Sequence, residues 1–245
     1  TKKHYIPNKM ILCAAGDVSH QKILDLSEKL FGNMKNSIPD FANKCDFVGG
    51  SLFKKKNLEQ THLAMSFETS GLKSEDIYAN QIFSIILGGG MSSRLFQEVR
   101  EKRGLCYSIY SSIDALSDSG TLTIYAGTNK EKISELSSII IKEIKKVSNK
   151  IDQKELERSK AQIKAGILMG MESTPSRCER LSRSLITWNK IKTLDEIIKK
   201  IDKVNLDDLR KVGENMCLSD NFSLVVYGQI GKDLDFNCLK NSLKE

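Results

Sequence analysis

Several short segments of the chain alternate apolar with polar residues, which is the pattern of a strand with one buried face. The clearest runs from His62 to Phe67, where Leu63, Met65 and Phe67 share one side. The turn-forming run 117–120 would join two of these segments as a hairpin. The pattern predicts strands near 51–54, 62–67, 107–116, 121–127 and 222–227. We expect all five strands to lie in one sheet.

Longer segments repeat apolar residues every three or four positions, which is typical of amphipathic helices. One such helix starts at Ser74 and ends at the three glycines 88–90. The next starts at position 92 or 93 and runs to about 103, where Gly104 stops it. Further helices are predicted at about 130–148, 153–171, 176–189, 193–202 and 205–216. Strands and helices are therefore mixed along the chain, as in an α/β or α+β fold.

The two ends of the chain resemble each other. Near the start, the apolar run Met10–Ala15 predicts a strand and is followed by Gly16. Near the end, Phe222–Tyr227 is followed by Gly228 in the same way. One interpretation is coincidence, because a strand followed by glycine is common. The other is that both segments close duplicated domains.

The duplication, if real, sets the domain boundaries. Residues 1–44 would then be the closing strand and helix of an upstream homologous domain, with the helix between Ser19 and Gly32. Residues 45–245 would form one complete second domain, after a linker at 39–50. Because the chain starts with Thr1 rather than Met, we also expect sequence to precede it in the parent protein.

Composition excludes several classes of function. The net charge is +7, but the lysine clusters carry no interleaved aromatic residues, so we expect no nucleic-acid partner. No apolar run approaches the ~18 residues of a membrane span, so we expect the chain to contain no membrane-spanning segment. The six cysteines form no C-x-x-C pair, which argues against a disulfide framework and weakly favours a reducing compartment.

The most informative segment is LGGGMSSRLFQEVREKRGLCYSIYSS, residues 87–112. Three glycines before a helix resemble a phosphate-binding loop, but no Lys-Ser/Thr pair follows and the G-x-G-x-x-G spacing is absent. The plainer interpretation is a tight corner between two helices. Further along, Arg100 and Tyr107 flank Gly104, where a chain reversal can bring a guanidinium and a phenol to one site. Both groups can donate a hydrogen bond to a carbonyl oxygen or an oxyanion.

A plainer interpretation of this pair stays open. Arg100 can pair with Glu101 or another acid, and Tyr107 can be half-buried strand surface. Spacing alone does not separate the two interpretations.

The same segment resembles a known family. The run GGGMSSRLFQEVREKRGLCYSIYS, residues 88–111, is similar to the second-domain signature of the pitrilysin/insulinase zinc peptidases, in their processing-peptidase branch. Residues 5–20 resemble the closing strand of the family's first domain, and residues 60–68 an early strand of its second. The resemblance implies a mixed, largely antiparallel sheet with helices packed against it, in homologous domains.

The resemblance also implies a zinc metalloendopeptidase whose zinc is held in the first domain on an inverted H-x-x-E-H motif. Here the three histidines, His4, His20 and His62, have no histidine partner four residues away. We therefore expect the zinc ligands to lie upstream of Thr1. This chain alone is expected to bind no metal and to be inactive as a peptidase.

In the family, an arginine and a tyrosine bind the scissile peptide, and they match Arg100 and Tyr107 here. The turn at Gly88, Gly89 and Gly90 resembles a shorter form of the glycine-rich loop of the non-catalytic processing-peptidase subunit, which implies substrate binding. The long form of that loop is not present.

The expected substrates are peptides, such as presequences or short unfolded peptides. The expected partners are an upstream zinc-bearing domain and a second subunit, in a homodimer or heterodimer. The compartment implied is the bacterial cytoplasm or the mitochondrial matrix. The alternative is a non-catalytic scaffold or core subunit of the same fold.

Overall fold

The computed structural model describes residues 4–37, 43, 45–218, 222–230 and 234–244. These divide into two compact units. Unit 1 comprises Thr1–Lys44 and Lys164–Ile198. Unit 2 comprises Cys45–Ile163 and Lys199–Glu245, and it contains the whole sheet and both candidate site residues.

Unit 2 is built on one five-stranded sheet in the order β1-β5-β2-β4-β3. Its strands are β1 (Gly50–Lys55), β2 (Thr61–Thr69), β3 (Cys106–Ala115), β4 (Gly120–Thr128) and β5 (Phe222–Gly228). The β1–β5 pair is parallel and the other three pairs are antiparallel. The mixed, largely antiparallel sheet is confirmed, as are all five predicted strands.

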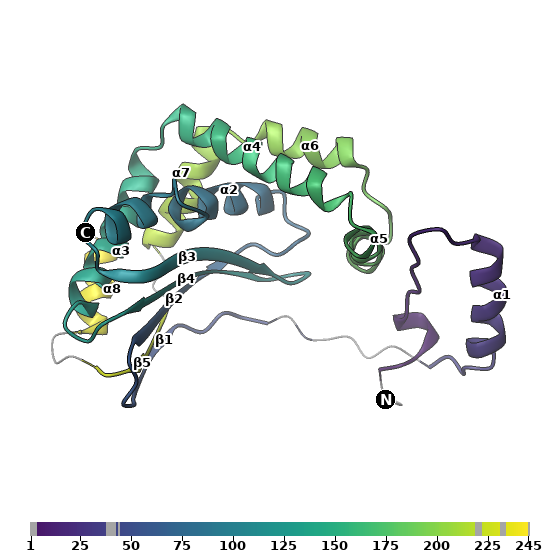
Figure 1. Cartoon of the computed structure of the whole chain (residues 1–245), viewed down its shortest axis with the longest axis horizontal. Helices are drawn as coiled ribbons and strands as arrows, with labels where there is room; N and C mark the ends of the chain where they lie inside the picture. Colours follow the sequence, from purple (N-terminus) through teal and green to yellow (C-terminus); the bar gives the residue numbers. More distant parts are fainter. Residues whose placement is uncertain (1–3, 38–42, 44, 219–221, 231–233, 245) are drawn as a thin grey trace. The chain divides into compact units, whose positions relative to one another are not determined.

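Four helices of unit 2 cover one face of this sheet, and Figure 1 shows them together on that side. They are α2 (Ile77–Gly88), α3 (Ile133–Asn149), α7 (Leu206–Leu218) and α8 (Phe236–Lys244). The alternation in β2 places Leu63, Met65 and Phe67 under them, all fully buried. The rings of Phe67 and Phe222 stack across the β2–β5 pair with centroids 5.4 Å apart. The core therefore lies between the sheet and these helices.

The opposite face of the sheet carries a row of rings from three adjacent strands. Tyr110, Tyr125 and His62 lie side by side, with centroids 5.1 Å apart for the tyrosines and 6.0 Å for Tyr125 and His62. The Tyr125 hydroxyl lies 2.7 Å from His62 Nδ1. All three rings are exposed or half-buried, so this face is polar and aromatic rather than part of the core.

Unit 1 contains a 3₁₀ turn at Pro7–Lys9, α1 (His20–Phe31) and α5 (Thr174–Trp188). The helices α4 (Gln153–Gly170) and α6 (Leu194–Lys203) cross the division between the units. The predicted helix after Gly16 is confirmed by α1. None of the described helices is long and apolar enough to cross a membrane.

The strand predicted at Met10–Ala15 was wrong for this structure. These residues form no strand, and Met10, Ile11 and Leu12 are exposed. A strand needs a neighbour to pair its backbone, and the described residues provide none here.

The glycines that follow the two resembling segments have similar backbone angles. Gly16 has φ 127° and Gly228 has φ 137°, a region that favours glycine at both positions. This agrees with the resemblance between the chain ends, although the boundaries 1–44 and 45–245 remain a prediction. The predicted linker lies partly outside the described residues, at 39–42 and 44.

Candidate functional site

Arg100 and Tyr107 lie on the two sides of a chain reversal. Arg100 belongs to η2 (Phe96–Glu101), a π-helical segment, so the helix predicted here is present, in π form over these residues. After it, Gly104 takes φ 57° and the chain turns into β3. The Gly104 amide donates to the Arg100 carbonyl at 3.0 Å, which closes the end of the helix. The predicted helix stop at Gly104 is therefore confirmed.

The backbone of this chain reversal is held by buried side chains and by hydrogen bonds from neighbouring segments. Val99 and Leu105 are buried on either side of it. Thr128 donates from Oγ1 to the Leu105 carbonyl at 2.5 Å, and Lys132 donates from Nζ to the Gly104 carbonyl at 2.8 Å. These contacts hold the backbone that carries both site residues.

A β-bulge determines where the Tyr107 side chain lies. In the β3–β4 pair, Cys106 faces Thr128 and Ser108 faces Gly127, which leaves Tyr107 as the extra residue. A bulge residue is released from the ladder, and bulges often redirect a side chain near active sites. The Tyr107 side chain is 76% exposed as a result.

The Arg100 guanidinium lies against two aromatic rings. Its carbon is 4.7 Å from the centroid of Phe96 and 5.6 Å from that of Tyr107. Cation–π contacts of this kind hold the guanidinium without using its N–H donors. Within the described part of the chain, Arg100 forms no ion pair, which contradicts the plainer interpretation from the sequence.

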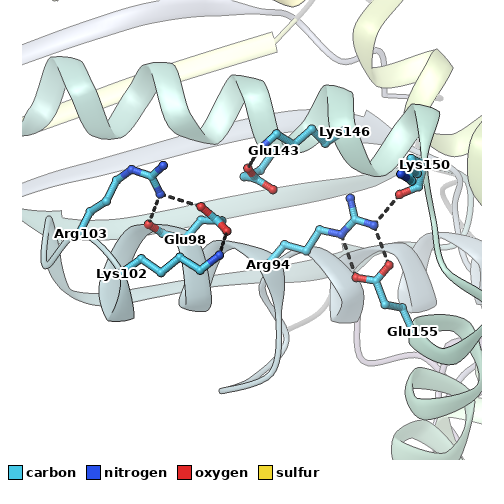
Figure 2. A network of polar contacts seen from close by, with 8 residues as sticks. All are labelled: Arg94, Glu98, Lys102, Arg103, Glu143, Lys146, Lys150 and Glu155. Atoms are coloured by element: carbon cyan, nitrogen blue, oxygen red, sulfur yellow. Dashed lines mark hydrogen bonds and ion pairs between the residues drawn. The ribbon is translucent and has the colours of Figure 1, made fainter.

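The neighbouring charges, in contrast, are held in structural contacts, which Figure 2 shows. Glu98 accepts from Lys102 and, at 2.7 Å, from Arg103. These hydrogen bonds lower the pKa of the Glu98 carboxyl to about 2. Arg94 binds Glu155 through two hydrogen bonds of 2.8 and 2.6 Å. Among the described residues, Arg94, Lys102 and Arg103 are thus in ion pairs, whereas Arg100 lies against aromatic rings.

The three glycines at the end of α2 have separate structural roles. A Cβ on Gly88 would lie 2.6 Å from the Ser111 amide nitrogen, so glycine is required for α2 to approach β3. The Gly89 carbonyl accepts from Gln162 Nε2 at 3.0 Å, and the Gly90 carbonyl from Ser93 Oγ at 2.6 Å. The tight corner expected from the sequence is present. Substrate binding by the three glycines remains a prediction.

A surface depression of about 270 Å³ lies beside Tyr107, and we call it the Tyr107 depression. It is lined by residues from three separate segments, among them Gln60, Cys106, Gly127, Asn129 and Lys132. Sequence reasoning missed Gln60, Asn129 and Lys132, because only the sheet brings them next to the bulge. Cys106, also part of the lining, is half-buried.

The described residues do not fit a zinc site. Among them, no group of three or more His, Cys, Asp or Glu side chains could hold a metal ion. His62 uses Nδ1 in its contact with Tyr125. Arg100 and Tyr107 can bind a peptide backbone, but they cannot hold a metal.

The sequence of the chain is similar to that of known proteins. Residues 1–163 match the family described as the peptidase M16 inactive domain. An uncharacterized zinc protease of Bacillus subtilis is 37% identical over 219 residues, which cover 89% of this chain and 53% of that protein. An uncharacterized zinc protease of Rickettsia felis is 35% identical over 225 residues, which cover 91% of this chain and 55% of that protein. The chain thus spans about half the length of these relatives.

Solved structures show the same fold. A chain of complex III from Candida albicans superimposes with a TM-score of 0.82 at 20% identity, covering 93% of this chain and 57% of that one. A protease from Helicobacter pylori gives a TM-score of 0.76 at 24% identity, and the match covers 87% of this chain and 54% of that one. With the family match and the zinc-protease relatives, these findings show that the chain belongs to the peptidase M16 family, the zinc peptidases of the pitrilysin and insulinase type, and corresponds to its inactive domain.

Proposed function

We propose that the intact protein is a zinc metalloendopeptidase and that this chain supplies Arg100 and Tyr107 as its peptide-binding pair. The observation that carries the proposal is that Tyr107 is exposed at a bulge with the Arg100 guanidinium stacked on its ring. Arg100 forms no ion pair with any of the described residues. A guanidinium and a phenol held together at the surface have donors free for a ligand. The zinc-protease relatives supply the reaction class.

The two side chains have different tasks in this proposal. The Tyr107 hydroxyl donates a hydrogen bond to the oxygen that becomes negative during attack on the peptide bond. The Arg100 guanidinium donates to a neighbouring backbone carbonyl and keeps the peptide extended. Both rest on a backbone fixed by Thr128 and Lys132, so little ordering is needed when the peptide binds.

The zinc and the rest of the site belong to other parts of the assembly. An upstream zinc-bearing domain, in the same subunit or in the partner of a homodimer or heterodimer, completes the site. The substrates are peptides, such as presequences or short unfolded peptides, because an arginine and a tyrosine directed at backbone oxygens do not require one sequence. This chain contributes the wall of the chamber that carries the pair.

A second candidate function is a non-catalytic scaffold or core subunit. It is favoured by the TM-score of 0.82 with a chain of complex III. At 20% identity that likeness shows the fold alone. The exposed and stacked Arg100–Tyr107 pair favours the peptidase, since a scaffold has no need of unused donors at a bulge.

The experiment is a metal-removal test on the full-length protein. We expect it to cleave a short unfolded peptide, to lose that activity when a chelator removes zinc, and to recover it when zinc is added back. The readout is product formation by mass spectrometry, together with zinc content by elemental analysis. A full-length protein that is folded and loaded with zinc yet cleaves no peptide would support the scaffold instead.

A further inference from the structure

The Tyr107 depression has a marked chemical bias. Its lining includes the ammonium of Lys132 and the amides of Gln60 and Asn129, and the described residues that line it carry no carboxylate. The Lys132 ammonium gives one of its three protons to the Gly104 carbonyl and keeps two. Burial raises the pKa of the Cys106 thiol to about 11, so the thiol is neutral at physiological pH. The depression is therefore positively charged and rich in donors.

The donors of the depression have no competing acid in its described lining. Gly127 lets the Gln60 side chain lie close to the sheet, since a Cβ there would come within 2.9 Å of Gln60 Oε1. The acid next along the chain, Glu131, forms an ion pair with Lys130 at 3.7 Å, and neither residue lines the depression. No acid of the described lining competes with a ligand for Lys132.

We infer that the Tyr107 depression is a substrate subsite that binds the carboxylate side chain of an aspartate or glutamate. This rests on the proposed function, in which Arg100 and Tyr107 hold the peptide backbone. Tyr107 itself lines the depression, so a side chain next to the bound backbone segment enters it directly. The carboxylate accepts hydrogen bonds from Lys132 and from the amides of Gln60 and Asn129. A lysine or arginine side chain there is repelled by Lys132.

The test measures peptide binding rather than cleavage, so that it does not depend on the reaction. Full-length protein, freed of zinc by a chelator, is titrated with fluorescently labelled peptides and followed by anisotropy. The peptides come in sets of three that differ at one position as Glu, Gln or Lys, and this position is moved along the peptide. At one position we expect Glu to bind about tenfold more tightly than Gln, as charge-assisted hydrogen bonds allow. The preference should shrink as sodium chloride is raised.

Two variants and a matched control locate the effect. Lys132→Gln removes the cation in the depression, while Lys130→Gln removes a cation two residues away that does not line it. We expect the Glu preference to be lost only in Lys132→Gln. Since Lys132 also bonds Gly104, Gln60→Glu serves as a second variant that leaves that contact intact. It should weaken binding of the Glu peptide about tenfold relative to the Gln peptide, because the added carboxylate repels the peptide's own.

The inference is overturned if no peptide position shows a Glu preference, either because the three peptides bind equally or because none binds. It is also overturned if Lys130→Gln shifts the preference as much as Lys132→Gln. These failures are distinct from failure of the proposed function. Loss of cleavage on chelation and in Tyr107→Phe is measured with a neutral peptide, which needs nothing from the depression.

Discussion

In the full-length enzyme, Tyr107→Phe is expected to lower kcat by about 10²–10³-fold, which is the usual effect of removing one oxyanion donor. The change deletes only the hydroxyl and keeps the ring that lies 5.6 Å from the Arg100 guanidinium. Because Tyr107 is 76% exposed, the substitution leaves the core intact. The measurement is steady-state cleavage of a neutral peptide, with zinc content and thermal unfolding recorded for the same preparation.

Tyr110→Phe is the matched control. Tyr110 lies three residues along β3, is exposed, and has a ring on the aromatic face of the sheet rather than beside Arg100. The same loss of one hydroxyl there should leave kcat close to that of the wild type. A wild-type rate in Tyr107→Phe would remove Tyr107 from the mechanism.

Arg100→Ala is expected to lower kcat/KM by roughly 10- to 150-fold, the equivalent of the ~1.5–3 kcal/mol of a hydrogen bond to a charged group. Much of this loss should be in peptide affinity, because the guanidinium holds a carbonyl that does not react. Arg100→Lys should restore only part of it, since lysine keeps the charge but lacks the planar, stacked donors. The readouts are KM and kcat, with peptide affinity measured on zinc-free protein.

Arg103→Ala provides the comparison for Arg100. Arg103 is close in sequence but binds Glu98, so its loss removes a structural ion pair and leaves the Arg100 stacking in place. We expect a modest fall in stability and near-normal kcat/KM. Equal losses in the two variants would mean that Arg100 acts only through net charge.

The sheet could be predicted from the sequence because its cause is local. Alternation such as that of Leu63, Met65 and Phe67 reports one buried face directly, and the ends of the observed strands lie close to the predicted ones. The strand predicted at Met10–Ala15 failed for a different reason. Its apolar pattern is strand-like, but a strand also requires a pairing partner, and a local pattern contains no information about that partner.

The chain reversal at the candidate site was predictable from the sequence, but its detailed geometry was not. Gly104 indicated a reversal between Arg100 and Tyr107, and the φ of 57° confirms it. The bulge that exposes Tyr107 depends on the register between β3 and β4, which no single segment determines. The apolar repeat predicted a helix over this stretch but did not predict its π form. The depression brings together residues 60, 104–107 and 127–132, which only the folded sheet makes neighbours.

The most direct test of the central claim is a structure of the zinc-free, full-length protein with an uncleaved peptide bound. We expect the Tyr107 hydroxyl and the Arg100 guanidinium within about 2.7–3.2 Å of backbone oxygens of the peptide. A peptide bound in the catalytic chamber with both side chains far from its backbone would contradict the account.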